Sequence, residues 1–393
     1  MKRLLCWLAV LIVIVAGWPG TAWAEEHDSL ESSLSWQDTV NKLDLEEMEQ
    51  FKTTIDGEIS GYLENRSVRE WLNDFMTGQW DFNPKEIAGN LWRYFFREVL
   101  ANSQLLGKII ILAVISALLV NLQSSFDQGV AKISSMACFL AVSAIALGSF
   151  KYVIQIGQAT IDSMTNFMAA VLPQMMVLVT GLGHVHTAAA IFPIMMAACT
   201  AFARGIGLIV FPLIALSAIL NLANQLTDTI KLERMGKLVY TLAEVIMGLM
   251  LTFFIGILTL RSIYGSVMDA LTLRTGKFVA DTFFPVIGGY LSDALETAAG
   301  YVVLLKQAVG ILGLLTIFGI FVFPVLKIGV IALIYKLSAA MVEPLGDNRI
   351  SQVLEIMGNH LFLALASVAA VGLMFFILVA ILVSTGNSVI LLR

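Results

Sequence analysis

The chain has 393 residues, of which 58% are hydrophobic and only 13% are charged, against about 25% charged in ordinary soluble domains. A mean hydropathy of +0.84 over this length excludes a soluble globular protein and indicates many membrane-spanning helices. The net charge of −5 leaves no basic surface of the kind that nucleic-acid binding needs. The three cysteines fall in apolar segments, which excludes a disulfide framework.

Residues 1–24 have the pattern of a secretory signal peptide. Lys2 and Arg3 form a positive start, an apolar run follows, and Ala24 is the last small residue before Glu25. We expect cleavage between Ala24 and Glu25, with the mature N-terminus outside the cytoplasm. An uncleaved membrane anchor is the alternative.

Residues 25–105 are acidic and predict a small exported helical domain or a set of membrane-apposed helices. Apolar residues recur at steps of three and four between Met48 and Tyr62, as on one face of an amphipathic helix. A short helix is expected over residues 69–76. Asn83 and Pro84 predict the start of a further helix, which continues toward the bilayer.

From Lys108 onward, apolar stretches of the ~20 residues needed to cross a bilayer follow one another. They are expected to be helical, because backbone in lipid must satisfy its own hydrogen bonds. The stretches 187–203 and 279–299 are short or charged and could be re-entrant, so the prediction is seven to ten membrane helices. The expected spans are 108–126, 133–156, 163–182, 187–203, 205–226, 238–260, 279–299, 301–318, 320–342 and 359–384.

Two elements ending in Phe-Pro suggest a degenerate internal repeat. Pro212 and Pro324 lie 112 positions apart, as do Pro173 and Pro285. In each copy the two prolines are followed by a Glu-…-Met-Gly element, Glu244–Gly248 in the first and Glu355–Gly358 in the second. After a first helix pair over 106–162, we therefore predict repeats over 163–261 and 275–393, the second including the C-terminal helix. Chance matches within an apolar alphabet are the alternative.

Polar groups within the predicted spans are candidates for function, because charge inside a membrane is costly. The four residues of a candidate polar path are Asn221, Glu244, Lys306 and Lys327. Structural pairing of the lysines and simple hydrogen bonding between helices are the alternatives.

The four repeat prolines are candidate pivots, because proline interrupts a helix and matching broken helices mark the midplane site of many transporters. Structural kinks without transport are the alternative. Membrane orientation stays open at this stage, and with it whether the repeats are parallel or inverted. The basic loop 228–237 favours the cytoplasm, but Arg261, Arg274 and Lys277 would then lie outside.

His184 and His186 alone do not predict a metal site, since no further ligand lies near them in sequence. No nucleotide-binding, hydrolase or metalloprotease motif occurs either. We expect neither an enzyme nor a cofactor.

Several long and uncommon strings resemble the stage III sporulation protein AE family of endospore-forming bacteria. The resemblance covers the full chain, with no defined catalytic residues to carry over. The strings are Phe167–Met175, Gly181–Gly183, Ala188–Pro193, Phe211–Pro212, Leu232–Lys237 and Thr275–Gly289.

The resemblance implies a multi-pass protein of the mother-cell membrane around the forespore, with an extracytoplasmic N-terminal domain. It implies an export-gate or permease-like part of a channel complex that supports late forespore sigma G activity. Implied partners are the lipid bilayer, the other stage III A-series proteins with their ATPase member and, indirectly, the forespore protein Q. The alternatives are a free-standing secondary transporter and a membrane scaffold that recruits ring proteins.

Overall fold

The computed structural model describes residues 84–122, 128–182, 192–226, 231–283, 288–345 and 348–385, with isolated positions 49, 67, 70, 74 and 189. All of them belong to one compact unit, Lys42–Arg393. The predicted signal peptide with Ala24 and Glu25, most of the exported domain, the pair His184 and His186, and Pro285 lie outside the described residues.

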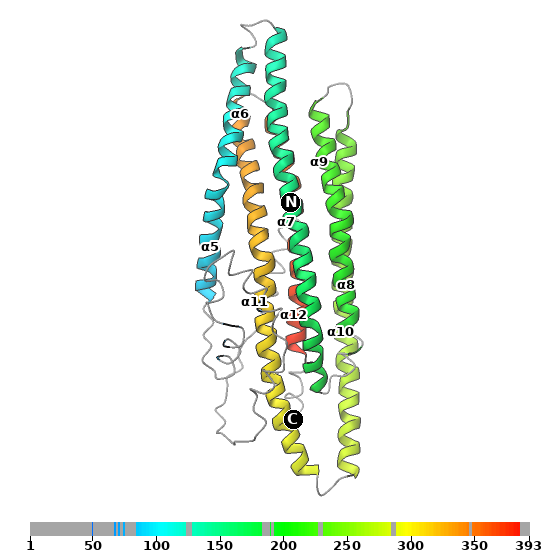
Figure 1. Ribbon diagram of the computed structural model, residues 1–393. Helices are drawn as coiled ribbons and strands as arrows, with labels where there is room; N and C mark the ends of the chain where they lie inside the picture. Colours follow the sequence, from blue (N-terminus) through cyan, green and yellow to red (C-terminus); the bar gives the residue numbers. More distant parts are fainter. Residues whose placement is uncertain are drawn as a thin grey trace. The chain divides into compact units, whose positions relative to one another are not determined.

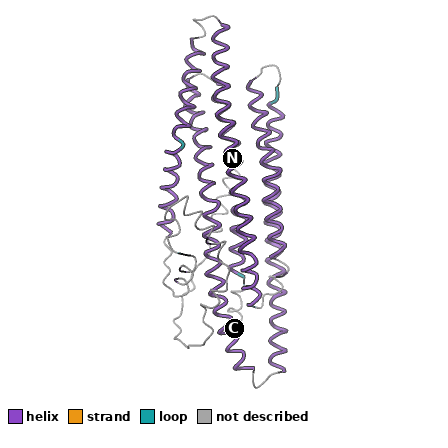
Figure 2. Tube along the Cα trace, viewed as in Figure 1, coloured by secondary structure: helices purple, strands orange, loops and turns teal. Residues whose placement is uncertain are grey.

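The described segments are helical throughout, with no strand among them, which confirms the all-α class (Figure 2). Long helices run alternately up and down and are joined by short connections (Figure 1). In chain order they are α5 (Pro84–Ala101), α6 (Ser103–Leu122), α7 (Gln128–Gly181), α8 (Phe192–Gly205), the π-helix η2 (Ile206–Val210), α9 (Phe211–Leu226), α10 (Glu233–Phe283), α11 (Gly288–Val342), the 3-10 helix η3 (Glu343–Leu345) and α12 (Asn348–Ser384).

Helix starts follow the local sequence. Ser67 and Glu70 exchange backbone–side-chain hydrogen bonds of 2.9 and 3.2 Å, a capping box at the start of the helix expected near residue 69. Helix α5 begins at Pro84. Proline suits this position, because the N–H of the first helical residue has no partner within the helix, so its absence costs no hydrogen bond.

Within the described residues, six helical segments are long and apolar enough to cross a membrane, against the seven to ten expected. The number falls because neighbouring predicted spans are joined. Helix α7 continues through 157–162, and the chain from Phe192 to Leu226 runs through η2. Helix α11 unites the predicted spans 301–318 and 320–342 with residues 288–299 of the predicted span 279–299, whose first residues belong to α10.

Glycines inside these helices allow close packing and do not end them. Gly157 lies in the interior of α7, and a Cβ placed on it would be 2.8 Å from the Phe211 ring of α9. Gly372 of α12 likewise admits the Phe321 ring of α11. Small residues are typical of membrane helix interfaces for this reason.

The core forms where α11 and α12 pack along each other and against α7. Buried apolar side chains line all three helices, among them Met164, Tyr335, Leu361 and Phe375. Helix α10 packs mainly on α9, and α5 packs on α11.

The predicted repeats begin and end inside helices: residue 163 lies within α7 and residue 261 within α10. The α8–α9 pass and the α11 pass are separated by the single pass of α10, so they run in the same direction (Figure 1). The helices that carry Pro212 and Pro324 are therefore parallel. The duplication itself stays a prediction.

Candidate functional site

Lys327 of α11 meets a charged partner at the side of the bundle. Its Nζ lies 3.9 Å from Oε1 of Glu98 on α5. The same ammonium lies 5.8 Å from the centroid of the Tyr152 ring on α7, a cation–π distance. The Lys327 side chain is 32% exposed and that of Glu98 only 11%. The pair thus joins a half-exposed cation to a nearly buried carboxylate.

Glu98 is held by its own helix. The Asn102 side-chain amide donates to Glu98 Oε1 at 2.9 Å, and the Tyr94 ring packs edge-on against Phe323 with centroids 5.0 Å apart. Tyr94 and Glu98 are four residues apart on α5, as Phe323 and Lys327 are on α11. One face of each helix therefore supplies an aromatic and a charged contact to the other.

Sequence reasoning missed Glu98, because it was assigned to the exported domain 25–105. The Tyr94–Glu98–Asn102 spacing on the helix that starts at Pro84 was the available signal for an inward polar face.

Asn221 belongs to a second polar cluster, between α9, α10 and α12. Its amide donates to the Ser217 carbonyl at 2.9 Å. Ser217 Oγ lies 2.8 Å from the Gly236 carbonyl and 2.8 Å from Nε2 of His360. His360 Nδ1 lies 2.7 Å from the Ile356 carbonyl, which only accepts, so Nδ1 carries a proton. In a neutral ring Nε2 can only accept, so the single Ser217 proton is shared between two alternative acceptors, the Gly236 carbonyl and His360 Nε2.

The cluster extends toward Glu244 on α10. The Tyr240 ring packs against the His360 ring with centroids 5.0 Å apart. Asn221 lies against Gly236, and Tyr240 and Glu244 follow Gly236 at steps of four on α10. Two of the four predicted path residues, Asn221 and Glu244, therefore lie in the same region of the bundle. Ser217, Tyr240 and His360 were not predicted, and single polar residues in apolar helices gave no signal for them.

Near the end of α9, polar side chains bond between elements. The Asn224 side-chain oxygen accepts from the backbone N–H groups of Leu232 and Glu233, at 2.8 and 3.1 Å. This arrangement caps the start of α10. Gln225 donates to Gln352 of α12 at 3.0 Å.

Lys306 lies apart from both clusters. It is fully buried and donates to the carbonyl of Thr385, just past the end of α12. A cation there is favoured by the carbonyl end of the helix. Lys306 and Lys327 are 21 residues apart on α11, about 31 Å along the axis. The four predicted path residues thus occupy three separate places.

The described prolines differ in their surroundings. Pro173 is exposed within α7, Pro324 is half-buried within α11, and Pro212 is exposed in the first turn of α9. The π-helix η2 ends at Val210, directly before Phe211 and Pro212, whereas α11 continues as an α-helix through Pro324. The helix therefore changes its form locally before the first Phe-Pro element and keeps its form at the second. In both elements the phenylalanine, Phe211 or Phe323, is buried.

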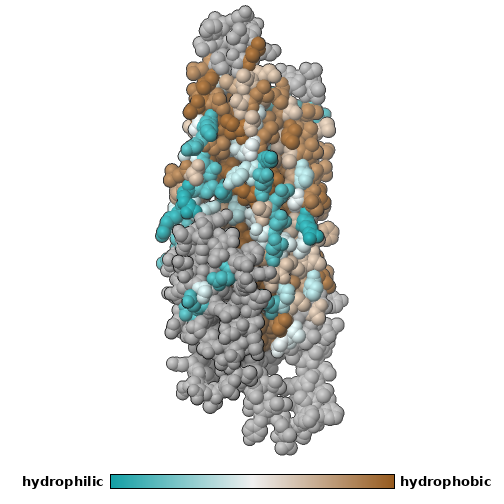
Figure 3. Space-filling model, in the orientation of Figure 1, coloured by the Kyte–Doolittle hydropathy of each residue, from teal (hydrophilic) through white to brown (hydrophobic). Residues whose placement is uncertain are grey.

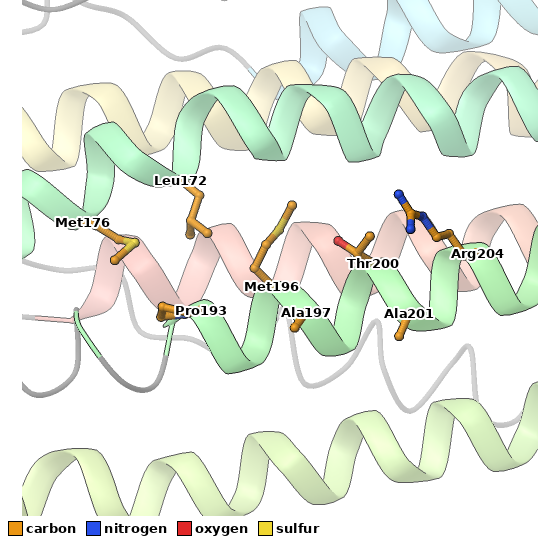
Figure 4. A pocket seen from close by; sticks show the side chains of 8 residues that line it. All are labelled: Leu172, Met176, Pro193, Met196, Ala197, Thr200, Ala201 and Arg204. Atoms are coloured by element: carbon orange, nitrogen blue, oxygen red, sulfur yellow. The ribbon is translucent and has the colours of Figure 1, made fainter.

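A groove of about 530 Å³ lies between α7 and α8 (Figure 4). Its lining is apolar apart from Thr200 and Arg204, and these side chains extend into the space between the helices (Figure 4). The described residues that line the groove include no carboxylate or thiol. No cluster of three or more possible metal ligands occurs among the described residues.

Comparisons with known proteins confirm the family resemblance. The family profile described as stage III sporulation protein AE matches residues 66–386. The stage III sporulation protein AE of Bacillus subtilis (strain 168) is 32% identical over 401 residues, covering 100% of both chains. No solved structure matches the chain. The chain belongs to the stage III sporulation protein AE family.

Proposed function

We propose that this chain is the polytopic, export-gate or permease-like component of a channel complex between mother cell and forespore. In this role it supports late forespore sigma G activity. Its partners are the other stage III A-series proteins, including their ATPase member, and indirectly the forespore protein Q. Support comes from family membership over the full chain and from six helices able to cross a membrane.

The Glu98–Lys327 pair is the observation that best supports a function beyond anchoring a soluble domain in the membrane. Both residues lie in segments able to cross a membrane, where an ionised side chain costs about 2.5–3.5 kcal/mol at the bilayer centre on insertion scales. A helix bundle that only anchors a soluble domain needs no such pair. Ionisable residues at this depth are typical of paths for polar solutes.

We further propose that the N-terminal domain lies outside the cytoplasm, at the mother-cell membrane that surrounds the forespore. The even number of helices able to cross a membrane, six among the described residues, supports a common side for the start of α5 and the end of α12. The opposite side receives the α9–α10 and α11–α12 connections, with Lys231, Arg234, Lys237 and Arg349. The positive-inside rule assigns this side to the cytoplasm. Arg261, Arg274 and Lys277, toward the far end of α10, go against the rule.

The test is a strain that lacks the gene. Engulfment is expected to proceed, while a sigma G-dependent reporter in the forespore stays silent and forespores collapse. Expression of the full chain in the mother cell should restore the reporter. Normal sporulation of the null strain would overturn the proposal. Transport of a solute by the purified chain alone in vesicles would favour the free-standing transporter.

A further inference from the structure

One face of α7 carries an exposed stripe of polar side chains. Its members recur at intervals of four, three, four and four residues, which places them on one side of the helix. The stripe runs from residue 151 to residue 166, 16 residues in all, which is about 22 Å along the axis. The opposite side of the same segment, with Val153 and Met164, is buried in the core. The polar stripe consists of Lys151, Gln155, Gln158, Asp162 and Asn166, all exposed.

The stripe lies at the depth of an apolar belt on neighbouring helices. Gly157, in the middle of the stripe segment, touches Phe211, which fixes the level of α9. Leu208, three residues before Phe211, is 76% exposed. Gly205 touches Met250 of α10, and the adjacent Leu249 is 52% exposed. At one depth, then, α10 and the α8–α9 pass present leucines to the outside while α7 presents amides and charges.

More polar groups border the stripe. Tyr152, next to Lys151, faces Lys327 and thereby the Glu98 pair. Arg93 and Arg97 of α5 are exposed on either side of Tyr94, which contacts Phe323. In Figure 3, hydrophilic side chains gather on the front face among hydrophobic ones. The exposed polar surface therefore extends from the stripe of α7 toward α5.

Contact with lipid cannot stabilise such a face. Two ionisable groups and three side-chain amides would each lose water, and a charge at the bilayer centre alone costs about 2.5–3.5 kcal/mol. Polar side chains in membrane segments face the protein interior or a water-filled cavity.

We infer that the polar stripe of α7 borders a water-filled path at bilayer depth. The inference rests on the proposed channel function and deepens it, because it names the wall of the path. Lys151 and Asp162, of opposite sign, lie near the two ends of the stripe, with amides between them. Such a wall suits hydrated polar solutes of either sign, while the leucine face of α8–α10 meets lipid.

Cysteine accessibility in isolated membranes, opened by freeze–thaw so that both faces are reached, tests the inference. The full chain would first have Cys6, Cys138 and Cys199 replaced by alanine. Gln155→Cys and Gln158→Cys probe the stripe, and Leu208→Cys and Leu249→Cys are the matched controls at the same depth. The probe is a charged, membrane-impermeant maleimide. The stripe cysteines should react at least tenfold faster than the controls.

Two results would overturn the inference. Inert cysteines at both stripe positions would show that lipid or protein covers the face. Equal labelling of stripe and control positions would show that this depth lies outside the bilayer. Asn166→Cys serves as a further stripe position if either glutamine variant does not accumulate. Labelling does not depend on sporulation, so the two proposals can fail separately. If the stripe reacts but the null strain sporulates normally, only the proposed function is contradicted. If the stripe is inert but the null strain is defective, only this inference is contradicted.

Discussion

Ser217 of α9 and His360 of α12 meet inside the bundle, with Oγ and Nε2 2.8 Å apart, although 143 positions separate them in the chain. Both are buried, and together with the Gly236 carbonyl they tie α9, α10 and α12 at one level. Removal of a buried hydroxyl leaves the group that it bonds to without a partner, which is costly. We therefore expect loss of this contact to lower the stability of the bundle, and to affect function only by that route.

Replacement of Ser217 by alanine should lower the free energy of unfolding by about 1–3 kcal/mol, the usual penalty for buried polar groups left without a partner. Thermal unfolding of the purified protein in detergent would measure the change. Ser384→Ala is the matched control, since that hydroxyl is exposed and bonds only within its own helix turn. A Ser217→Ala variant as stable as the control would show that the contact adds nothing.

Gly236→Ala should separate α9 from α10. A Cβ at this position would lie 2.7 Å from the Asn221 side-chain oxygen, closer than real Cβ contacts occur. The variant should unfold at a lower temperature, and the added change Asn221→Ala should restore part of the loss because it removes the clashing amide. A Cβ at Gly248, on the same helix, would have no neighbour within 4 Å. Gly248→Ala should therefore raise the free energy of unfolding by up to about 1 kcal/mol, because alanine favours the helix more than glycine does. Equal stability of Gly236→Ala and Gly248→Ala would contradict the close approach.

Prediction from sequence succeeded where one residue's chemistry decides the local structure. Pro84, a residue suited to the first turn of a helix, predicted the start of α5. Helix ends inside apolar stretches were poorly predicted. Polar residues lower the hydropathy near Asp162, yet the helix continues, because Gln158, Asp162 and Asn166 lie on one exposed face of α7.

The candidate site was predictable only in part, for a related reason. Lys327 was recognised as a costly charge, but its partner Glu98 lies 229 positions away, and no local pattern links two such distant positions. The polar path itself stays a prediction. Lys306 lies apart from the other three residues, because its burial against the end of α12 depends on tertiary packing.

The two Phe-Pro elements should respond differently to alanine. Pro212→Ala restores a backbone N–H beside η2, so the π-helix should tighten toward regular α-helix. The helix should also become more stable, because a proline inside a helix costs about 3 kcal/mol relative to alanine. Pro324→Ala should stabilise α11 without changing its form. If the prolines are pivots, both variants should accumulate in the membrane yet fail to restore the forespore reporter. Full activity of both would leave the prolines as packing features.

Reporter activity in strains that carry variants of the Glu98–Lys327 pair tests the central claim most directly. Breaking a largely buried pair by removing one partner costs about 3–5 kcal/mol, a figure to be reduced here because Lys327 is 32% exposed. Lys327→Met and Glu98→Gln should each silence the sigma G-dependent reporter while the protein still accumulates in the membrane. The exchanged pair Glu98→Lys with Lys327→Glu should restore part of the signal, because it keeps opposite charges together. Full reporter activity in the Lys327→Met strain, with wild-type protein levels, would contradict the account and favour a membrane scaffold.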